Sequence, residues 1–325
     1  MRRSRRRQPA RSQRSRRIPV GTIVTLTMNP ALDIATSTDR VVPTHKLRCS
    51  PPRYDPGGGG INVARAVHAL GGDAVAIFPV GGPAGEMITH LLDQEGVPHH
   101  SIAIAGFTRE SLAVEDRQTG EQFRFILPGP EIAEADQERC LDQLSAVAAE
   151  ADFIVASGSL PLGVREDFYA RLAQLAQMLG KRFVLDTSGG ALKQAGHGIY
   201  LLKPSLRELQ DLAGREIDSP LDQESAAREV IEQGRSEIVV LSLGAEGALV
   251  VTEQECERFA AVPVEARSTV GAGDSMLAGI VLALSRGLPL RQAVRFGLAA
   301  GAAALLGSGT ELCRRSDVER LYQPM

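Results

Sequence analysis

The sequence of 325 residues predicts an α/β fold, a doubly wound parallel sheet with a small β-sheet lid. Beyond residue 130, short apolar runs alternate with segments whose apolar residues recur at helical spacing. Strands that alternate with helices form a parallel sheet that helices cover on both faces. Two β-rich segments, at about 31–56 and 100–127, have no helix pattern beside them. We therefore expect these two segments to form a small sheet that stands off the main domain.

Before residue 130, periodicity and turn residues outline the first elements. The run INVARAVHAL is apolar at helical spacing, and Gly71-Gly72 ends it. The turn residues Thr119-Gly120 separate two alternating segments, as in a β-hairpin. The predicted elements are a strand at 22–28, a helix at 61–70, a strand at 74–80, a helix at about 84–95, and hairpin strands at 111–116 and 122–127.

After residue 130, helices and strands are expected in turn, which is the order of a parallel sheet. The predicted helices lie at 134–149, 164–179, 205–213 and 222–234. The predicted strands lie at 153–156, 183–186, 200–203 and 237–243. A hairpin at 248–264 and a long helical segment at 273–306 follow.

The charge of the chain is divided unevenly. Residues 1–17 contain nine Arg and no acidic residue, so the remainder carries a net charge of −12 within a whole-chain charge of −3. We predict that 1–17 is a disordered basic extension, because it has almost nothing to bury, and that 18–325 is the folded domain. The extension is either an anchor for nucleic acid or another acidic surface, or a dispensable segment. The acidic body, poor in aromatic residues, disfavours nucleic-acid binding.

Cysteine spacing and the length of apolar runs indicate where in the cell the protein is located. Cys49, Cys140, Cys256 and Cys313 form no Cys-x-x-Cys pair and no disulfide framework, which is typical of a reducing compartment. No apolar run approaches the roughly 18 residues of a membrane helix. The Arg-rich start lacks the apolar stretch of a secretory signal. We predict a cytoplasmic protein with no membrane partner.

Two glycine-rich segments each precede a predicted helix. They are PGGGGIN at 56–62 and STVGAGDS at 268–275. Glycine lets a ligand approach the backbone closely, and the start of a helix presents free N–H groups and a positive dipole. Both segments therefore suit an anionic or strongly polar ligand.

Two common nucleotide-binding motifs do not fit these segments. The G-x-G-x-x-G fingerprint fails because Asn62 and Val63 stand where a third glycine is needed. The P-loop pattern fails because Gly180-Lys181 is followed by Arg182 and not by Ser or Thr. A Rossmann dehydrogenase and a P-loop kinase both lose support.

The two glycine-rich segments together resemble the signature patterns of the PfkB, or ribokinase-like, carbohydrate kinases. The resemblance is carried by PGGGGINVARAVHALGG at 56–72 and TVGAGD at 269–274, and it extends from about residue 21 to the C-terminus. Within the family, the chain is most similar to the PfkB-type 6-phosphofructokinases. That closer likeness depends on the order and spacing of LTMNPALD (26–33), KLRC (46–49), SGSLPLG (157–163), SLGAEGAL (242–249) and GTELC (309–313).

The resemblance implies a ribokinase-like fold and ATP-dependent phosphorylation of a sugar phosphate, fructose 6-phosphate to fructose 1,6-bisphosphate. 1-Phosphofructokinase and tagatose-6-phosphate kinase activities are alternatives, because such enzymes share nearly every motif and differ in which end of the sugar faces the catalytic carboxylate. A non-catalytic sugar-phosphate sensor on the same fold is an alternative from another class. The intact catalytic motif argues against the sensor.

The resemblance assigns phosphoryl transfer to the second glycine-rich segment. It implies that Asp274 is the base that accepts the proton of the acceptor hydroxyl. The N–H groups of Gly271, Ala272 and Gly273 are implied to face the γ-phosphate as an anion hole. At the start of a helix, the dipole should keep this carboxylate ionised and weakly basic. Without the resemblance, an Asp at this position would be interpreted as a helix cap.

The sugar site is expected around the first glycine-rich segment and in the lid. The resemblance implies that Asp33 and Asn62 bind sugar hydroxyls, together with the backbone of Gly58 and Gly59. Cations in the lid segments, with a serine as neutral donor, suit the phosphate already on the sugar. These candidates are Lys46, Arg48, Arg109 and Ser159.

The resemblance also implies an ATP site in the second half of the chain. Its residues are Lys203, Ser205, Glu208, Ser242, Gly244 and Gly247. The family pattern Lys-Pro-Asn-x-x-Glu reads KPSLRE at 203–208 in this chain, and Leu162 stands where a second Pro is common. The hydroxyl of Ser205 reaches less far than an amide, so the affinity for ATP or Mg²⁺ is expected to differ.

Ions and a second subunit complete the expectations. Mg²⁺ should enter with ATP, held mainly by phosphates and water. The resemblance implies a monovalent cation, K⁺, with the backbone carbonyls of Ser268, Val270 and Gly309 as candidate ligands. A small sheet needs a second covering layer, which a twin subunit could supply. We therefore expect a homodimer through the lid.

Overall fold

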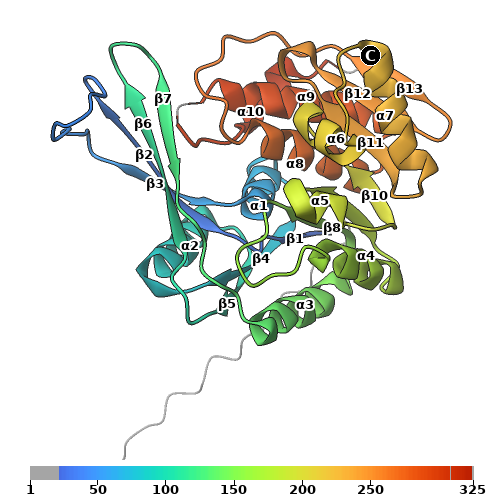
Figure 1. The fold of residues 1–325 in the computed structure, drawn as a ribbon, viewed down its shortest axis with the longest axis horizontal. Coiled ribbons are helices and arrows are strands. Elements are labelled where there is room, and N and C mark those ends of the chain that lie inside the picture. The colour runs from blue at the N-terminus through green and yellow to red at the C-terminus, as the bar shows by residue number, and fades with distance from the viewer. Residues whose placement is uncertain (1–21, 308, 324–325) are drawn as a thin grey trace, which may run out of the picture.

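Two β-sheets organise the chain, which a computed structural model describes over residues 22–307 and 309–323 (Figure 1). The predicted basic extension, 1–17, lies outside these residues. Within the described residues, one sheet has nine strands and the other has four. The predicted α/β architecture with a small second sheet is confirmed.

The large sheet runs in the order β13-β12-β11-β10-β9-β8-β1-β4-β5. Its strands are β1 (Thr22–Leu26), β4 (Ala74–Val80), β5 (His99–Ala103), β8 (Ala151–Ser157), β9 (Arg182–Asp186), β10 (Ile199–Leu202), β11 (Ser236–Ser242), β12 (Ala248–Thr252) and β13 (Cys256–Phe259). The strands from β5 to β11 in this order pair in parallel, and β12 and β13 extend one edge in antiparallel fashion. The order reverses beside β1, since β4 lies on one side of it and β8 on the other.

Helices cover both faces of the large sheet, as expected for parallel strands. On one face lie α1 (Gly59–Ala69), α2 (Gly82–Glu95), α8 (Ala272–Ser285), α9 (Leu290–Leu305) and α10 (Arg315–Leu321). On the other lie α3 (Glu134–Ala148), α4 (Phe168–Met178), α5 (Gly189–Lys193), α6 (Leu206–Ala213) and α7 (Pro220–Glu232). Among the helices of the described residues, none has the length and apolar character that a membrane span requires.

Two hydrophobic cores result, because neighbouring residues of a strand face opposite sides of the sheet. In β1, Ile23 belongs to the core beneath α1 and α8, whereas Val24 and Leu26 belong to the core beneath α3 and α4. In β8, Phe153 and Ile154 divide in the same way. The sheet is therefore buried on both faces, and only the ends of its strands are left to form a site.

Helix α8, which begins in the second glycine-rich segment, packs very closely on α9. A side-chain carbon at Gly279 would lie 2.9 Å from the Cα of Gly297. A side-chain carbon at Gly297 would lie 2.7 Å from the carbonyl oxygen of Met276. Because both residues lack a side chain, the two helices touch through their backbones, which fixes the position of the start of α8.

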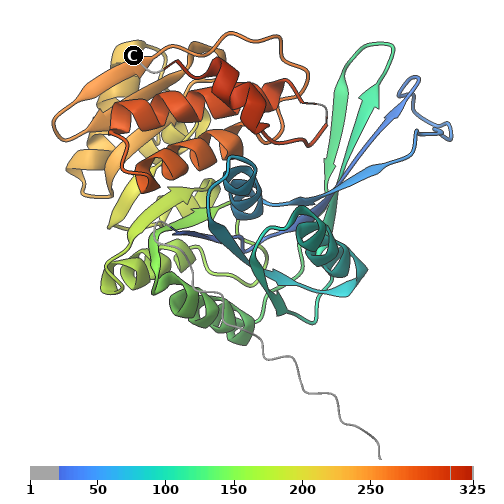
Figure 2. The ribbon, with the colours of Figure 1, turned by 180° about the vertical axis from the view of Figure 1, so that it is seen from behind.

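The small sheet projects from the end of the main domain that carries β4 and β5 (Figures 1 and 2). Its order is β3 (Arg53–Gly57), β2 (Ala31–Thr38), β6 (Arg109–Asp116) and β7 (Gln122–Ile126). The predicted hairpin is confirmed, because β6 and β7 pair in antiparallel fashion. The predicted lid segment 100–127 begins too early, since 99–103 form β5 and pair with β4 in the large sheet.

Other differences from the predicted elements are local. The helical segment expected at 273–306 is two helices, because Gly287 adopts a φ of +79° and Pro289 precedes the first turn of α9. The sequence did not predict the short helices α5 and α10 or the edge strand β5. These elements are too short to show a clear period.

Candidate active site

Polar residues gather at one edge of the large sheet, where its parallel strands end. Of the predicted site residues, Lys203 directly follows β10 and Ser242 ends β11; Ser157 and Asp186, which were not predicted, are the last residues of β8 and β9. The strand order reverses at β1, and a crevice is expected beyond the carboxyl ends of strands at such a point. The edge therefore has the position of a ligand site in an open α/β fold.

Asp274 lies in the first turn of α8 and is held by side chains from two other elements. Asn62 Nδ2, from α1, donates a hydrogen bond to Oδ2 at 3.0 Å. Ser157 Oγ, at the end of β8, donates to Oδ1 at 3.4 Å. The side chain stays partly exposed. The carboxylate is thus oriented by its neighbours and still open to the crevice.

The acidity of Asp274 differs from the sequence-based expectation. Burial and, to a smaller extent, the charge of Asp186 raise the pKa of Asp274 to about 6, against the opposing effects of Asn62, Lys203 and Ser157. The expectation that the helix dipole leaves a weak base was therefore wrong, because loss of water outweighs it. A base with a pKa near 6 is better matched to proton transfer near neutral pH.

Behind this turn, Lys203 and Asp186 form a buried ion pair. Their Nζ and Oδ2 atoms are 2.9 Å apart, and Lys203 is 5% exposed. Burial lowers the pKa of Lys203, but the charge and hydrogen bond of Asp186 outweigh it, so the net pKa is raised. A side-chain carbon at Gly273 would lie 3.6 Å from Nζ. A permanent positive charge therefore lies next to the predicted anion hole.

The turn before α8 requires glycine. Gly271 adopts a φ of +74°, and a side-chain carbon there would lie 2.6 Å from Cδ2 of Leu312. The first bond of the helix runs from Ser275 N–H to the carbonyl of Gly271 at 2.8 Å. The preceding N–H groups, which include those of Ala272 and Gly273, have no partner within the helix and can bind an anion.

The first glycine-rich segment is pressed against the ends of β1 and β8. Gly58 adopts a φ of +109°, and a side-chain carbon at Gly59 would lie 2.7 Å from the carbonyl carbon of Ser157. The N–H of Ile61 donates to Thr27 Oγ1 at 2.8 Å. This close approach positions the first turn of α1, and with it Asn62, beside Asp274.

Asp33 lies on β2 of the small sheet, in register with Asp55 of β3 and Ser111 of β6. A side-chain carbon at Gly57 would lie 2.5 Å from Cγ of Asp33, so its carboxylate rests on glycine backbone. Burial raises the pKa of Asp33 to about 6, against the lowering effect of Arg109. The lid therefore carries a second carboxylate that titrates near pH 6.

Arg109 and Ser159 are joined by Asn29. Arg109 donates from Nε to Asn29 Oδ1 at 3.0 Å and from Nη2 to the Asn29 carbonyl at 3.1 Å. Asn29 Nδ2 donates to Ser159 Oγ at 3.2 Å. Burial lowers the pKa of Arg109, and the charge of Asp33 raises it in part. The structure thus joins two of the four predicted phosphate ligands.

The other two predicted phosphate ligands lie elsewhere. Lys46 and Arg48 are exposed on the connection between β2 and β3, at the far tip of the small sheet (Figure 1). The Arg48 backbone carbonyl accepts a bond from Thr38 Oγ1 at 3.3 Å. Within a single chain, the described contacts do not bring Lys46 or Arg48 to Arg109.

A cavity of about 650 Å³ opens beside the turn before α8. Its lining includes Ala272 and Gly273, and also Ser242, Gly244 and Gly247 of the predicted ATP site. Apolar side chains form most of the remaining wall: Val262, Val264, Met276, Leu298 and Leu305. A pocket of this size, apolar with polar groups at one end, suits the base of a purine nucleotide whose phosphates point to Gly273.

Ser205 and Glu208 have a structural task in this chain. Ser205 N–H donates to Glu208 Oε2 at 2.7 Å, and Glu208 N–H donates to Ser205 Oγ at 3.3 Å. This capping box starts α6. The sequence stretch Ser-x-x-Glu already carries this signal, which the family pattern had obscured.

The candidate ligands of the monovalent cation lie around the turn before α8, and two candidate carboxylates for Mg²⁺ lie near Lys203. Ser268 Oγ donates to the Gly309 carbonyl at 2.6 Å and accepts from Val270 N–H at 3.3 Å. The charges of Asp186 and Glu208 both act on Lys203. Oxygen ligands of this kind fit Mg²⁺. In the described residues no group of three or more His, Cys, Asp and Glu side chains is arranged as a metal site.

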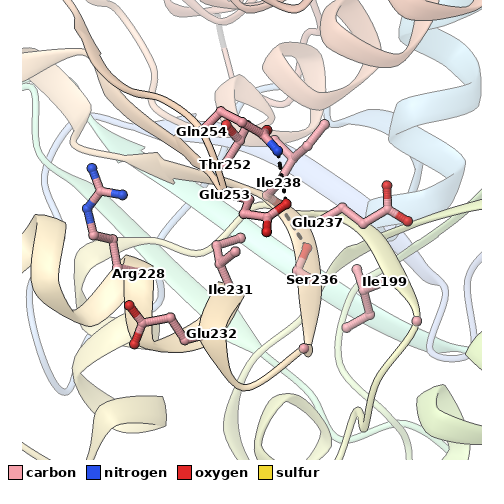
Figure 3. A pocket seen from close by; sticks show the side chains of 12 residues that line it. Ile199, Arg228, Ile231, Glu232, Ser236, Glu237, Ile238, Thr252, Glu253 and Gln254 are labelled. Atoms are coloured by element: carbon pink, nitrogen blue, oxygen red, sulfur yellow. Dashed lines mark hydrogen bonds between the residues drawn. The ribbon is translucent and has the colours of Figure 1, made fainter.

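A larger hollow, of about 880 Å³, lies at the opposite edge of the sheet (Figure 3). Ile199 and Ser236, at the amino ends of β10 and β11, belong to its lining. Glu232 and Glu237 lie on either side of Ser236 in this view. None of the predicted site residues lines it. Ligands of open α/β sheets bind at the carboxyl ends of strands, so this hollow is not the candidate active site.

Comparison with known proteins agrees with this geometry. A sequence profile described as pfkB family carbohydrate kinase matches residues 26–317. The ATP-dependent 6-phosphofructokinase isozyme 2 of Mycobacterium tuberculosis is 53% identical over 301 residues, covering 93% of this chain and 89% of the relative. The chain belongs to the pfkB family of carbohydrate kinases.

Other members of this family extend the comparison. The ATP-dependent 6-phosphofructokinase isozyme 2 of Escherichia coli is 44% identical over 303 residues, covering 92% of this chain and 97% of the relative. A crystal structure of phosphofructokinase-2 from E. coli with fructose-6-phosphate has a TM-score of 0.87 at 42% identity, with 92% and 97% covered. One with potassium has a TM-score of 0.88 at 44% identity and the same coverage. A relative named 1-phosphofructokinase, from Xanthomonas campestris, is 35% identical over 267 residues, with 80% and 83% covered.

Three contacting residues escaped the sequence analysis. Asn29, Ser157 and Asp186 each lie at or just beyond the end of a parallel strand. That position was the available signal, because polar residues at the carboxyl ends of neighbouring strands converge. A single polar residue after a strand is also common in turns, so the pattern alone does not separate the two roles.

We predict that Asp274→Asn lowers kcat by roughly 10²–10⁴-fold, because the variant cannot accept the acceptor proton. The melting temperature at pH 7 should be unchanged or higher. The raised pKa means that ionised Asp274 opposes folding above pH 6, and the amide removes that cost. The matched control is Asp317→Asn, which changes an acid in the first turn of α10. A variant that turns over at the normal rate would remove Asp274 from the reaction.

The two raised carboxylates predict the pH dependence of kcat/KM. Both pKa values are about 6, so activity should fall as pH drops through 6 and each carboxylate takes up a proton. In Asp33→Asn the slope of log kcat/KM against pH on the acid side should be smaller by about one, because one carboxylate fewer takes up a proton. Titration of the substrate phosphate is common to both enzymes and cancels in the comparison. Identical slopes would contradict the prediction.

Proposed function

We propose that this protein is an ATP-dependent 6-phosphofructokinase, which converts fructose 6-phosphate to fructose 1,6-bisphosphate. The observation that carries the proposal is the position of Asp274. Its carboxylate accepts a hydrogen bond from Asn62 of the sugar side, and the two residues before it, Ala272 and Gly273, line the cavity suited to a nucleotide. Relatives of that name at 44–53% identity support the same reaction.

In the proposed reaction, the oxygen of the sugar C1 hydroxyl attacks the γ-phosphorus of ATP, and Asp274 accepts the proton of this hydroxyl. The bond from oxygen to phosphorus forms while the bond from the γ-phosphorus to ADP breaks, and ADP leaves. The N–H groups around Ala272 and Gly273 and the charge of Lys203 stabilise the transferred group. Asp274 then returns its proton to solvent.

The proposed sugar contacts divide between the main domain and the lid. Asp33 and Asn62 bind hydroxyl groups, with the backbone of Gly58 and Gly59 close by. Arg109 and Ser159 bind the 6-phosphate, since a guanidinium forms paired bonds to phosphate oxygens. Asn29, which bridges both side chains, keeps them at one place until substrate arrives.

Mg²⁺ and K⁺ are proposed as the ions of this enzyme. Mg²⁺ bound to ATP would neutralise phosphate charge, and Asp186 and Glu208 are the carboxylates proposed to face it. For K⁺, the carbonyls of Ser268, Val270 and Gly309 are proposed ligands. The potassium complex of the E. coli protein supports a monovalent cation in this fold.

The proposed assembly is a homodimer through the lid. Register and alternation place Ile34, Tyr54, Leu112 and Phe125 on one face of the small sheet. Tyr54 is 40% exposed and Phe125 is 52% exposed. An apolar face of this kind is expected to be covered. The E. coli protein has a tetrameric inhibited form, so a relative of this chain does form an oligomer.

A cytoplasmic location remains a prediction.

The test of this function is a comparison of kcat/KM for fructose 6-phosphate, fructose 1-phosphate and tagatose 6-phosphate with ATP. We expect fructose 6-phosphate to be the best of the three. A preference for fructose 1-phosphate would assign the chain to the activity of the relatives that are 32–35% identical. Absence of turnover with all three, together with tight binding, would support the sensor.

We also predict that Arg109→Ala raises KM for fructose 6-phosphate by roughly 10–100-fold, because a charge-assisted contact to phosphate is lost. The KM for ATP should change by less than about twofold. The matched control is Arg117→Ala, which removes an exposed cation, paired with Asp39, from the turn between β6 and β7 of the same sheet. An unchanged KM for the sugar phosphate in Arg109→Ala would exclude Arg109 from the phosphate site.

A further inference from the structure

A short loop, 309–313, lies against the turn that precedes α8. Ser268 Oγ donates to the carbonyl of Gly309 at 2.6 Å, and Cys313 N–H donates to Ser275 Oγ at 3.3 Å. A side-chain carbon at Gly271 would touch Leu312. The loop therefore contacts the turn before, within and after the predicted anion hole, and a shift of the loop would move that turn.

The other side of this loop is bound to the lid. Arg53, on β3, donates from Nη1 to Glu311 Oε1 at 2.8 Å and from Nη2 to Thr310 Oγ1 at 3.2 Å. Its Nε donates to Asp55 Oδ2 at 2.8 Å, and Thr310 Oγ1 donates to the same carboxylate. One guanidinium thus joins the lid strand to two successive residues of the loop.

The network continues from β3 into the main domain. Asp55 Oδ1 lies 3.6 Å from Arg65 Nη2, and Arg65 donates twice to Glu95 of α2, at 2.7 and 2.6 Å. Arg65 also donates to the carbonyl of Pro56 at 2.8 Å. Alternating charges therefore link α2, the lid strand and the loop beside α8. A network of this kind stabilises more than an isolated surface pair.

The substrate groups proposed above lie at the two ends of this connection. Asp33 is the cross-strand neighbour of Asp55 on the lid, and Asp274 follows the turn on which the loop rests. A side-chain carbon at Gly309 would lie 3.1 Å from Cβ of Ala35, so lid and loop also touch directly. The sugar side and the phosphoryl-transfer side thus meet at this contact.

We propose that Arg53 is a positioning residue that fastens the lid to loop 309–313, so that binding of the sugar phosphate and binding of ATP reinforce each other. The proposal depends on the proposed function for the identity of the two ligands. Arg53 is not one of the residues proposed to bind the sugar phosphate or ATP, and it acts through Glu311 and Thr310. Replacing it leaves the carboxylates of Asp55 and Glu311 without its charge, which loosens the lid from the loop.

The experiment measures the dissociation constant of fructose 6-phosphate with and without a non-hydrolysable ATP analogue. In the unmodified protein, the analogue should tighten sugar binding by roughly fivefold or more. In Arg53→Met and in Glu311→Met this factor should fall toward one. The double variant should show no further loss, since both changes break the same contact. The long apolar side chain keeps the packing of the stem.

The matched control is Arg117→Met, in the turn between β6 and β7 of the same sheet. Arg117 pairs with Asp39 at 2.7 Å, and their side chains are 52% and 89% exposed, compared with 35% and 28% for Arg53 and Glu311. This pair does not touch loop 309–313, so the coupling factor should remain that of the unmodified protein. Loss of coupling in the control as well would show a general effect of lid charge and overturn the proposal.

Two other outcomes would also overturn it: no coupling in the unmodified protein, or full coupling in Arg53→Met. A readout without ligands separates this inference from the proposed function. Amide hydrogen exchange should accelerate in 53–57 and 309–313 of Arg53→Met and stay unchanged in α3. If the sugar does not bind but exchange accelerates, the function is wrong and the fastening stands. If the sugar binds and exchange is unchanged, the fastening is wrong.

Discussion

Partial removal of Asp274 from water is the constraint on which the site depends. The helix dipole favours the ionised carboxylate, and burial together with Asp186 opposes it. Burial prevails, which produces a base of intermediate strength. Lys203 limits the effect, because its own charge is kept by the pair with Asp186. The same buried cation lies beside Gly273, so one ion pair influences both the base and the predicted anion hole.

The two glycine-rich segments have a common physical purpose, which is close contact between backbones. Gly59 lets α1 approach the end of β8, and Gly271 lets the turn before α8 lie against Leu312. These contacts place Asn62 and Asp274 within hydrogen-bond distance, although they are 212 residues apart in sequence. The lid is attached in another way, by charged side chains. A contact made by Arg53 and Glu311 can open and close more readily than a glycine contact in the core.

The fold was predictable because two kinds of signal alternate along the chain. The helices α1 and α8 carry apolar residues at helical spacing, and the strands β1 and β8 are short apolar runs that are buried on both faces of the sheet. The predictions failed where a signal is short or shared. Residues 100–103 were assigned to the lid, but they belong to β5 and extend the large sheet, because β-rich runs look alike in either sheet. The hydroxyl of Ser205 caps α6, a role that the family pattern did not indicate, and its place in the ATP site stays a prediction.

From its own residues, the sequence determined the α/β class, the positions of the two glycine-rich turns and, through family resemblance, the candidate groups for catalysis. The tertiary structure alone decided which of these groups meet: Arg109 joins Asn29 and Ser159, while Lys46 and Arg48 remain at the tip of the lid. It also decided the acidity of Asp33 and Asp274. Neither contact nor pKa is a property of a residue in sequence, because both depend on the water and charges that distant segments remove or supply.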